Sequence, residues 1–347
     1  MTETAAQPGI GVVVVAYNSA DVIAACVRSL LASDHPALHV VVCDNASQDD
    51  TLSVVRAQAP DSFAELADDG LAAAQVQPPA RLTLVRCGRN LGFAGGVNVG
   101  LELLRAQPQI ELFWVLNPDC VVPPETAGLY AATAQRVGRF GLMGCRTVFL
   151  EPGDRVQTDG GRVSRWTGVC ESVHRGVAAD THALPAAASL DYISGANMVA
   201  SRAFLERAGP LQEDYFLYYE EVDWAFRRGD LPLVLAEGAR VYHHGGTTIG
   251  SGTLSRRPSA FANYFNYRNR MRFLAHFAPA GLASAYVMSL ARIAKLLLLC
   301  AWDEADGAAR GLHGLPPPPS VRARIAPNAR EIAFGPARPG RVAEQGR

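Results

Sequence analysis

The first 145 residues alternate short apolar runs with amphipathic segments, and this alternation limits the fold more than any other feature of the chain. Residues 10–16 form a continuous run dominated by valine, which is typical of a strand buried on both faces. Similar runs occupy residues 38–43, 81–87 and 110–116. Because strands separated by helices form parallel sheets with right-handed crossovers, we predict an α/β fold built on a mostly parallel, doubly wound sheet.

Helices are expected between these strands. Ser19 is a candidate N-cap for the first helix and Ser47 for the second, because a hydroxyl there can accept a free backbone N–H. A third helix is predicted over residues 97–107. Residues 61–80 are rich in Ala, Asp, Gln and Pro without periodicity, which indicates a surface insertion.

Polar residues follow each of the four predicted strands. They are Tyr17 with Asn18, Asp44 with Asn45, the loop after Cys87, and Asn117-Pro118-Asp119. A strand that ends in Asn-Pro-Asp is by itself more often a simple turn, although a lone carboxylate there also suits magnesium. Ligands of open α/β sheets bind beyond the carboxyl ends of the strands, so the four polar tips together predict a binding crevice.

The third tip, residues 89–100, is a glycine-rich turn that enters a helix. Glycines allow the backbone to approach a ligand closely, and helix-terminal N–H groups favour phosphate. The segment is not the dinucleotide fingerprint, which needs G-x-G-x-x-G directly after the first strand. This chain has Ala16-Tyr17-Asn18 at that position, which argues against a Rossmann dehydrogenase.

Composition narrows the class of protein. The formal net charge of −1 gives no argument for nucleic acid as a partner. The seven cysteines are scattered, without C-x-x-C or a spacing suited to zinc, so we expect reduced thiols in the cytosol. Residues 1–8 are short and polar and do not lead into an apolar stretch, so secretion is not expected.

Four motifs occur in a characteristic order: residues 12–18, 43–47, 90–98 and 116–119. Together they resemble the inverting family 2 glycosyltransferases, and most closely the rhamnosyltransferase-like branch. The resemblance covers about residues 9–275. It implies a GT-A fold in which Asp44 contacts the base of a nucleotide-sugar and Asp119 belongs to a metal-binding Asp-x-Asp motif. The first Asp of that motif is Asn117 here, which removes one charge from the site.

The same resemblance implies a donor site at the strand tips and a divalent cofactor, Mg²⁺ or Mn²⁺. The expected donor is dTDP-rhamnose or another pyrimidine diphosphate sugar. The residues expected to bind it are Tyr17, Asn18, Asp44, Asn45, Asn90, Gly92, Phe93, Ala94, Gly95, Asn98 and Asn117.

The densest polar cluster of the second half lies within residues 216–228. A helix is predicted from about Tyr219, and Asp223 and Arg227 can pair along it at i, i+4 spacing. One interpretation of the cluster is a solvated acidic turn on an amphipathic helix. The other is catalysis, because inverting transfer requires a base within hydrogen-bonding reach of the acceptor hydroxyl.

The resemblance aligns Glu220-Glu221 with a Glu-Asp pair whose second member is the base. We therefore predict Glu221 as the base. Because Glu is one methylene longer than Asp, Asp223 and Glu220 remain alternatives. For the acceptor, Gly195 lies in the small-residue segment 192–200, and Trp224 could either stack on a sugar or fill the core.

Two histidines, His243 and His244, are predicted at the end of a later strand. A lone histidine there is commonly a satisfied structural hydrogen bond. In related enzymes a histidine at this position completes the metal or diphosphate site, and His243 fits that position better. The predicted metal pair is therefore Asp119 and His243.

The C-terminal part of the sequence has a different composition. Residues 261–277 are rich in aromatic residues and Arg and precede an apolar helix at residues 282–302. Arg292 and Lys295 interrupt that helix, so its uncharged run is too short to span a bilayer. It could lie at a membrane interface, or pack on the catalytic domain or a second subunit. After residue 315 the Pro- and Arg-rich remainder is predicted to be disordered.

The domain prediction has four segments. Residues 9–145 form the nucleotide-sugar half and residues 146–260 the acceptor-binding and catalytic half of a GT-A domain. Residues 261–314 form a helical extension, and residues 315–347 a disordered tail.

The predicted function is inverting hexosyl transfer, with rhamnose moved from a nucleotide diphosphate to a glycan or lipid-linked glycan in cell-surface polysaccharide synthesis. The predicted location is the cytoplasm, peripheral at the inner face of the cell membrane, with a homo-oligomer as an open option. A nucleotidyltransferase would need a basic glycine-rich loop after the first strand, which the chain lacks. A catalytically inactive subunit that binds sugar-nucleotide or glycan is the other alternative, to which the departures at Asn117 and Glu221 are relevant.

Overall fold

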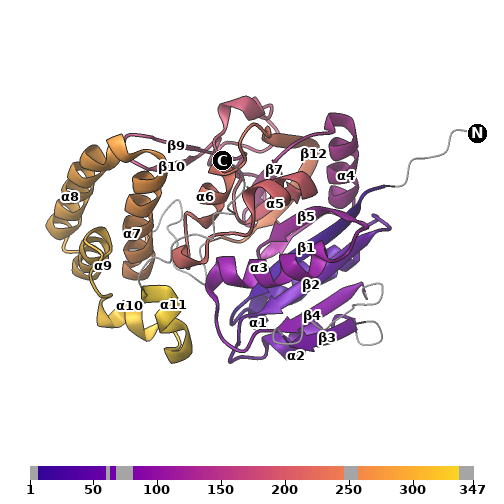
Figure 1. Ribbon diagram of the computed structural model, residues 1–347, viewed down its shortest axis with the longest axis horizontal. Coiled ribbons are helices and arrows are strands. Elements are labelled where there is room, and N and C mark those ends of the chain that lie inside the picture. The colour runs from indigo at the N-terminus through magenta and orange to yellow at the C-terminus, as the bar shows by residue number, and fades with distance from the viewer. Residues whose placement is uncertain (1–6, 60–62, 68–80, 246–256, 336–347) are drawn as a thin grey trace, which may run out of the picture.

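The computed structural model describes residues 7–59, 63–67, 81–245 and 257–335. Its centre is a sheet that, within these residues, contains ten strands in the order β3-β4-β2-β1-β5-β11-β7-β12-β6, with β8 paired to β7 (Figure 1). The strands are β1 (Gly9–Ala16), β2 (Leu38–Asp44), β3 (Phe63–Ala67), β4 (Leu82–Arg86), β5 (Ile110–Leu116), β6 (Cys120–Val121), β7 (Leu142–Phe149), β8 (Val156–Thr158), β11 (Asn197–Ser201) and β12 (Val234–His243).

The first half of the sheet is parallel throughout. β3, β4, β2, β1 and β5 all run in the same direction, whereas β11 is antiparallel to both of its neighbours, β5 and β7. The predicted α/β fold with a mostly parallel sheet is confirmed. Since the parallel strands all end at one edge, their polar tips lie on the same side of the molecule.

Helices cover both faces of this sheet. The helices that precede the C-terminal region are α1 (Ala20–Leu31), α2 (Thr51–Arg56), α3 (Gly92–Arg105), α4 (Thr126–Val137), α5 (Arg202–Ala208) and α6 (Glu220–Phe226). In β1, Val12 and Val14 pack with α1 and α4, whereas Val13 packs with α3 on the opposite face. Both faces of β1 are therefore buried, which explains its continuous apolar sequence.

Two helix starts differ from the sequence-based prediction. The second helix begins at Thr51, because the Ser47 hydroxyl accepts the Asn18 N–H at 3.0 Å instead of capping a helix. The third helix begins already at Gly92, whose N–H donates to the Asn90 side chain at 2.9 Å. Ser19 precedes the first helix as predicted, but its hydroxyl bonds to Tyr17 and not to a helical N–H.

The predicted insertion at 61–80 also contains regular structure. Phe63–Ala67 forms the edge strand β3, parallel to β4, and Glu65 in it pairs with Arg56 at 2.9 Å and Arg86 at 2.7 Å. The insertion prediction is wrong for this strand. Residues 60–62 and 68–80 lie outside the described residues.

The C-terminal helices form a separate layer at the left of Figure 1. They are α7 (Ala260–Phe277), α8 (Leu282–Leu298), α9 (Trp302–Leu312), α10 (Pro319–Ala323) and α11 (Arg330–Phe334). The predicted apolar helix of residues 282–302 is shorter in the structure: α8 ends at Leu298, the chain turns, and Trp302 begins α9. The polar residues of α7 tie this layer to the loop before α6: Asn269 donates to the carbonyls of Tyr215 and Leu217.

The prediction of a disordered tail is wrong for residues 319–334. Val321, Ile325, Ala329 and Ala333 are buried together against Phe261 and Phe265 of α7. These four residues lie in α10, in α11 and in the segment between the two helices, and they are buried because this part of the chain folds onto α7. Residues 336–347 lie outside the described part of the chain.

Candidate active site

Hydrogen bonds connect the first three predicted strand tips. The Asn18 side chain accepts the Gln48 N–H at 2.8 Å, which joins the tips of β1 and β2. The Asn45 amide donates to the Gly92 carbonyl at 2.8 Å, which joins the tip of β2 to the start of α3. The structure therefore brings Tyr17-Asn18, Asp44-Asn45 and the glycine-rich turn together at one edge.

At this edge, one carboxylate oxygen of Asp44 has no hydrogen-bond partner among the described residues. Asp44 Oδ2 accepts the Ser47 N–H at 3.2 Å, while Oδ1 is buried and makes no hydrogen bond to any of the described residues. Burial raises the pKa of the Asp44 carboxyl, although the bonds from Ser47 oppose the rise. A buried oxygen without a partner costs about 1–3 kcal/mol, so a ligand N–H that reached it would remove an existing penalty.

The glycines of α3 serve helix packing. A side chain at Gly96 would lie 2.7 Å from Val15, and one at Gly100 would lie 2.6 Å from Val13. These positions let α3 lie directly on β1. Gly92 has a positive φ of 74°, and a Cβ there would lie 2.7 Å from the Phe216 carbonyl oxygen.

Two residues predicted to bind the donor are engaged in packing. The side chain of Ala94 is fully buried. Asn98 bonds through its side chain to both backbone groups of Leu211 and to Glu213. Gly95 is buried inside α3, tight against Leu91, whereas Phe93 remains partly exposed beside Gly195.

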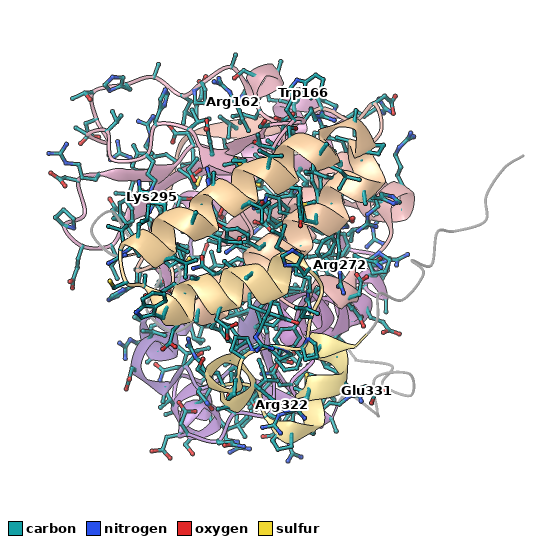
Figure 2. All side chains as sticks on the ribbon, turned by 90° about the vertical axis from the view of Figure 1, so that its left-hand side faces the viewer. Arg162, Trp166, Arg272, Lys295, Arg322 and Glu331 are labelled. Atoms are coloured by element: carbon teal, nitrogen blue, oxygen red, sulfur yellow. The ribbon has the colours of Figure 1, made fainter. Side chains whose placement is uncertain are left out.

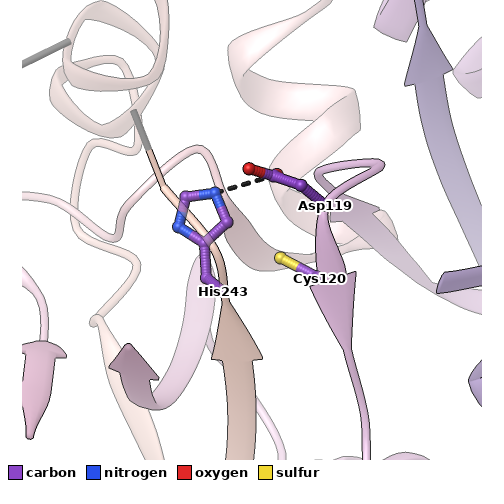
Figure 3. Close-up of side chains that lie close together, drawn as sticks. All are labelled: Asp119, Cys120 and His243. Carbon is purple, nitrogen blue, oxygen red and sulfur yellow. Dashed lines mark ion pairs between the residues drawn. The ribbon is translucent and has the colours of Figure 1, made fainter. Parts of the chain in front are cut away.

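The predicted metal pair is adjacent in space (Figure 3). Asp119 Oδ1 lies 3.0 Å from His243 Nε2, and the Gly245 N–H donates to Asp119 Oδ2 at 3.2 Å. Burial tends to raise the pKa of Asp119, but the hydrogen bond and charge of His243 and the Gly245 N–H outweigh it and lower that pKa. Asn117 joins the pair, since its Nδ2 lies 3.3 Å from His243 Nε2. His244 is exposed, which agrees with the choice of His243.

Sequence reasoning missed Gln157, which belongs to β8. Its Oε1 lies 2.6 Å from His243 Nδ1, so the imidazole can donate Nδ1–H to it, which holds the ring with Nε2 facing Asp119. Histidines that bind metals are commonly oriented in this way through their second nitrogen. No motif marks Gln157, because only the pairing of β8 with β7 brings it beside His243.

The donor set fits a hard divalent cation. Asp119 and His243 supply one oxygen and one nitrogen, and Cys120 Sγ lies in the same group of ligand atoms, all within 4.8 Å of one another. Burial raises the pKa of the Cys120 thiol well above its usual range, and the thiol donates to the Ala196 carbonyl at 3.5 Å. With Sγ engaged in this bond, the oxygen of Asp119 and the nitrogen of His243 are the ligands that suit Mg²⁺ or Mn²⁺.

The acidic cluster of α6 lies at the same edge. The Asn117 N–H donates to the Ala196 carbonyl at 3.0 Å, and the neighbouring Gly195 packs against the Glu221 side chain. The chain enters α6 through Tyr218 and Tyr219, both with positive φ, at 68° and 74°. Such conformations cost energy in residues other than glycine and are often retained where a side chain must be aimed.

Glu220 and Glu221 have unusual protonation equilibria. Glu220 is buried, and its Oε2 has no hydrogen-bond partner within the described part of the chain. Burial, assisted by the charge of Glu221, raises the pKa of Glu220 well above its usual range. Burial also raises the pKa of Glu221, which is only partly buried and lies beside Gly195. A carboxylate with a raised pKa is a stronger proton acceptor than an ordinary one.

The two other predicted residues of α6 have structural partners. Asp223 accepts from Arg227 at 2.7 Å, as the i, i+4 spacing predicted, and from the Tyr215 hydroxyl at 3.3 Å. Trp224 is fully buried, packs edge-on against Phe204 and donates to the Gly209 carbonyl. It presents no ring face to an acceptor, so its predicted stacking on a sugar disagrees with the structure.

Comparison with known proteins adds sequence and fold evidence. Residues 11–159 match the sequence model described as "Glycosyl transferase family 2". The "Low-salt glycan biosynthesis hexosyltransferase Agl10" of Haloferax volcanii is 26% identical over 193 residues, which are 54% of this chain. The alignment spans 58% of the length of that relative.

Similar solved structures show the fold. The mannosyltransferase PcManGT from Pyrobaculum calidifontis, solved with GDP-Man and Mn²⁺, gives a TM-score of 0.50 at 18% identity, over 94% of this chain and 78% of that one. S. aureus TarS in complex with UDP-GlcNAc gives 0.51 at 15% identity, over 94% and 84%. The predicted GT-A architecture with a C-terminal helical region is confirmed.

Proposed function

We propose that this chain transfers a sugar from a nucleotide diphosphate donor to an acceptor hydroxyl, with inversion at the anomeric carbon, because residues 11–159 match the sequence model of glycosyltransferase family 2. The observation that carries the proposal is the meeting, at one sheet edge, of the Asp119–His243 pair and the Glu220–Glu221 pair. Inverting transfer needs a group that stabilises the leaving diphosphate and a base for the acceptor, and these two pairs supply both.

In this proposal Asp119 and His243 hold a divalent cation, Mg²⁺ or Mn²⁺. When bound, the ion offsets negative charge on the departing diphosphate. Asp119 is prepared for this role because its lowered pKa keeps it ionised. Gln157 keeps the imidazole turned so that Nε2 faces the carboxylate.

Glu221 is proposed to accept the proton of the acceptor hydroxyl as that oxygen attacks. Gly195 lies against its aliphatic part, where an added Cβ would be 3.4 Å from Glu221 Cβ. Glu220 is buried, and its raised pKa favours the neutral form, which limits a second negative charge beside Glu221. Asp223 is the weaker alternative because Arg227 and Tyr215 already occupy its oxygens.

The donor is proposed to be a pyrimidine diphosphate sugar, with dTDP-rhamnose as the specific candidate, and Asp44 as the contact for its base. The free buried Oδ1 of Asp44 supports a contact with a base N–H. The acceptor is proposed to be a glycan or lipid-linked glycan of the cell surface, reached by an enzyme peripheral to the inner face of the membrane. The described site is compatible with hexosyl donors, as in the named hexosyltransferase relative.

A thermal-shift screen of nucleotide-sugars, with and without Mn²⁺, tests the proposal first. We expect selective, metal-enhanced stabilisation by a pyrimidine diphosphate sugar, followed by turnover of the stabilising donor. Stabilisation by a purine diphosphate sugar would correct the donor but keep the reaction. Binding without hydrolysis or transfer, under any acceptor tried, would instead support the inactive binding subunit, and turnover of a nucleoside triphosphate would support the nucleotidyltransferase.

A further inference from the structure

The exposed large apolar side chains of the described residues are concentrated in one region. They are Tyr286, Val287, Leu290, Leu297, Leu298, Leu299, Trp302 and Leu315, together with Trp166. All but Trp166 lie within residues 286–315, on or next to α8 and α9. Apolar side chains gathered in this way on a soluble fold indicate a contact surface.

The two faces of α8 differ sharply. Ala285, Ser289 and Ile293 are buried, and Arg270 of α7 donates to the Ser289 hydroxyl at 2.6 Å. On the opposite side Val287 is 65% exposed and Leu298 is 85% exposed. The helix is therefore attached along its inner side, and its outer apolar side has no partner among the described residues.

Trp166 extends this outer surface from another part of the chain. It lies in the turn between the short strands β9 (Gly161–Val163) and β10 (Cys170–Ser172) and is 67% exposed. Its carbonyl accepts the Ser284 hydroxyl near the start of α8. Trp302 follows the other end of α8 and is 63% exposed. In Figure 2 Trp166 lies at one end of the helix and Lys295 toward the other.

The charges on α8 itself are positive. Arg292 and Lys295 are exposed there, and residues 279–302 contain no Asp or Glu, whereas Asp303 and Glu304 follow at the start of α9. Arg162 is exposed in β9, on the side that faces the viewer in Figure 2, and lies opposite Glu171 of β10. An apolar face flanked by basic residues, with tryptophans at its ends, is typical of a helix that lies in the interface of an anionic membrane.

Spanning the membrane is a less suitable arrangement for this helix. Residues Pro279–Leu298 are long and apolar enough to cross a bilayer by length and composition, with a mean hydropathy of 1.4. Crossing would, however, expose Ser289 and Arg270 and require α8 to leave its contacts with α7 and α9. Lying in the plane of the membrane keeps these contacts and lets Arg292 and Lys295 reach the headgroups.

We propose that the outer face of α8, with Trp166 and Trp302 at its ends, is a docking surface for an anionic lipid bilayer. The surface is close to the proposed catalytic helix. Gly168, two residues after Trp166, accepts the Tyr219 hydroxyl at 2.7 Å, and Tyr219 directly precedes α6. Provided that the proposed function is correct, docking here brings the acceptor side of the site to lipid-linked glycans.

Vesicle flotation of the full chain tests the docking surface. We expect binding to vesicles of equal parts phosphatidylglycerol and phosphatidylcholine, and weaker binding to pure phosphatidylcholine or at high salt, because screening removes the contribution of the basic residues. Val287→Glu with Leu298→Glu should reduce binding to the anionic vesicles at least tenfold. Ala132→Glu, which adds a charge to the exposed surface of α4, is the matched control and should bind like the wild type.

Three results would overturn the proposal. These are failure of the wild-type chain to float with anionic vesicles, equal flotation of the double variant, and a wild-type dimer that the double variant converts to monomer without any vesicle binding. The last result would assign the face to a second copy of the chain. Donor hydrolysis is measured in parallel without vesicles, so loss of docking with hydrolysis intact separates this proposal from the proposed function.

Discussion

The two polar pairs at the edge of the sheet have opposite electrostatic settings. Asp119 is partly buried, yet His243 and the Gly245 N–H lower its pKa. Glu220 is also buried but has an oxygen without a partner, and its pKa is raised, as is that of Glu221. Burial acts in the same direction at all three carboxyls, so the partners decide the outcome.

This difference assigns different chemistry to similar side chains. A carboxylate held ionised by partners suits a cation, whereas a carboxyl with few partners and a raised pKa suits proton transfer near neutral pH. In the proposed function the edge therefore has two halves. Asp119, in the turn between β5 and β6, and His243 of β12 hold charge, whereas the glutamates of α6 accept a proton. Substitutions that disable one half at a time test whether the two halves have these separate roles.

The largest effect is expected from Asp119→Ala. Loss of the ionised oxygen should abolish both Mn²⁺ binding and turnover, because His243 alone is a poor site for a divalent ion. Calorimetric titration with Mn²⁺ and a donor-turnover assay measure the two effects, and circular dichroism checks that the variant is folded. Full activity of chelator-treated wild-type enzyme would remove the metal from the proposal.

Glu221→Gln should cost about 10²- to 10⁴-fold in rate, which is typical for loss of a general base. The loss should appear in kcat with little change in donor affinity, because the interaction forms chiefly in the transition state. The wild-type rate should rise with pH through the raised pKa of Glu221, since only the ionised form accepts a proton. In the variant that part of the profile should be flat.

Three companion variants locate the base. Glu220→Gln and Asp223→Asn should retain most activity, and Glu221→Asp tests whether reach or only charge matters. A near-normal Glu221→Gln beside an inactive Asp223→Asn would move the base to Asp223. Near-normal turnover in all three amide variants would return the cluster to a solvated acidic turn.

The sequence was most informative where local pattern and function coincide. The apolar runs predicted β1, β2, β4 and β5 closely, and the polar residues after them predicted the edge at which Asp119 and His243 meet. The alternation of strand and helix leaves few topologies, so the edge followed from chain order.

The predictions failed where composition concealed the residues that become buried, or where tertiary contacts determine the position of a side chain. Residues 319–334 were expected to be disordered because Pro and Arg dominate, yet their buried apolar residues pack on α7. Trp224 was compatible with either core or site, and only its contact with Phe204 placed it in the core. Gln157 had no local signal at all, since strand pairing brings it to His243.

Gln157→Leu should weaken Mn²⁺ binding about 10- to 100-fold, the usual effect of losing a group that orients a metal-binding histidine. Electron paramagnetic resonance measures the free Mn²⁺. The ¹⁵N shifts of the His243 imidazole in the metal-free protein should show loss of the Nδ1–H form. Gln157→Glu keeps an acceptor for Nδ1–H and is the matched control. Equal Mn²⁺ affinity and an unchanged imidazole spectrum in Gln157→Leu would limit Gln157 to a packing role.

The smallest predicted effect is on stability, and it tests whether Glu220 of α6 is protonated in the native protein. Above pH 4.5, the ordinary value for the group, Glu220 releases its proton in the unfolded chain but keeps it in the native protein. The native state then binds more protons, so stability falls as pH rises, by at most about 1.4 kcal/mol per pH unit, until the native pKa is passed.

Gln resembles the neutral carboxyl and cannot ionise, so Glu220→Gln should match the wild type near pH 4.5 and be more stable at pH 8, by about 2 °C or more in Tm. Glu206→Gln, at an exposed position of α5, is the control and should keep the wild-type pH dependence. If Glu220→Gln also keeps that dependence, Glu220 is ionised in the native protein, and the separation between the two halves of the edge loses its electrostatic basis.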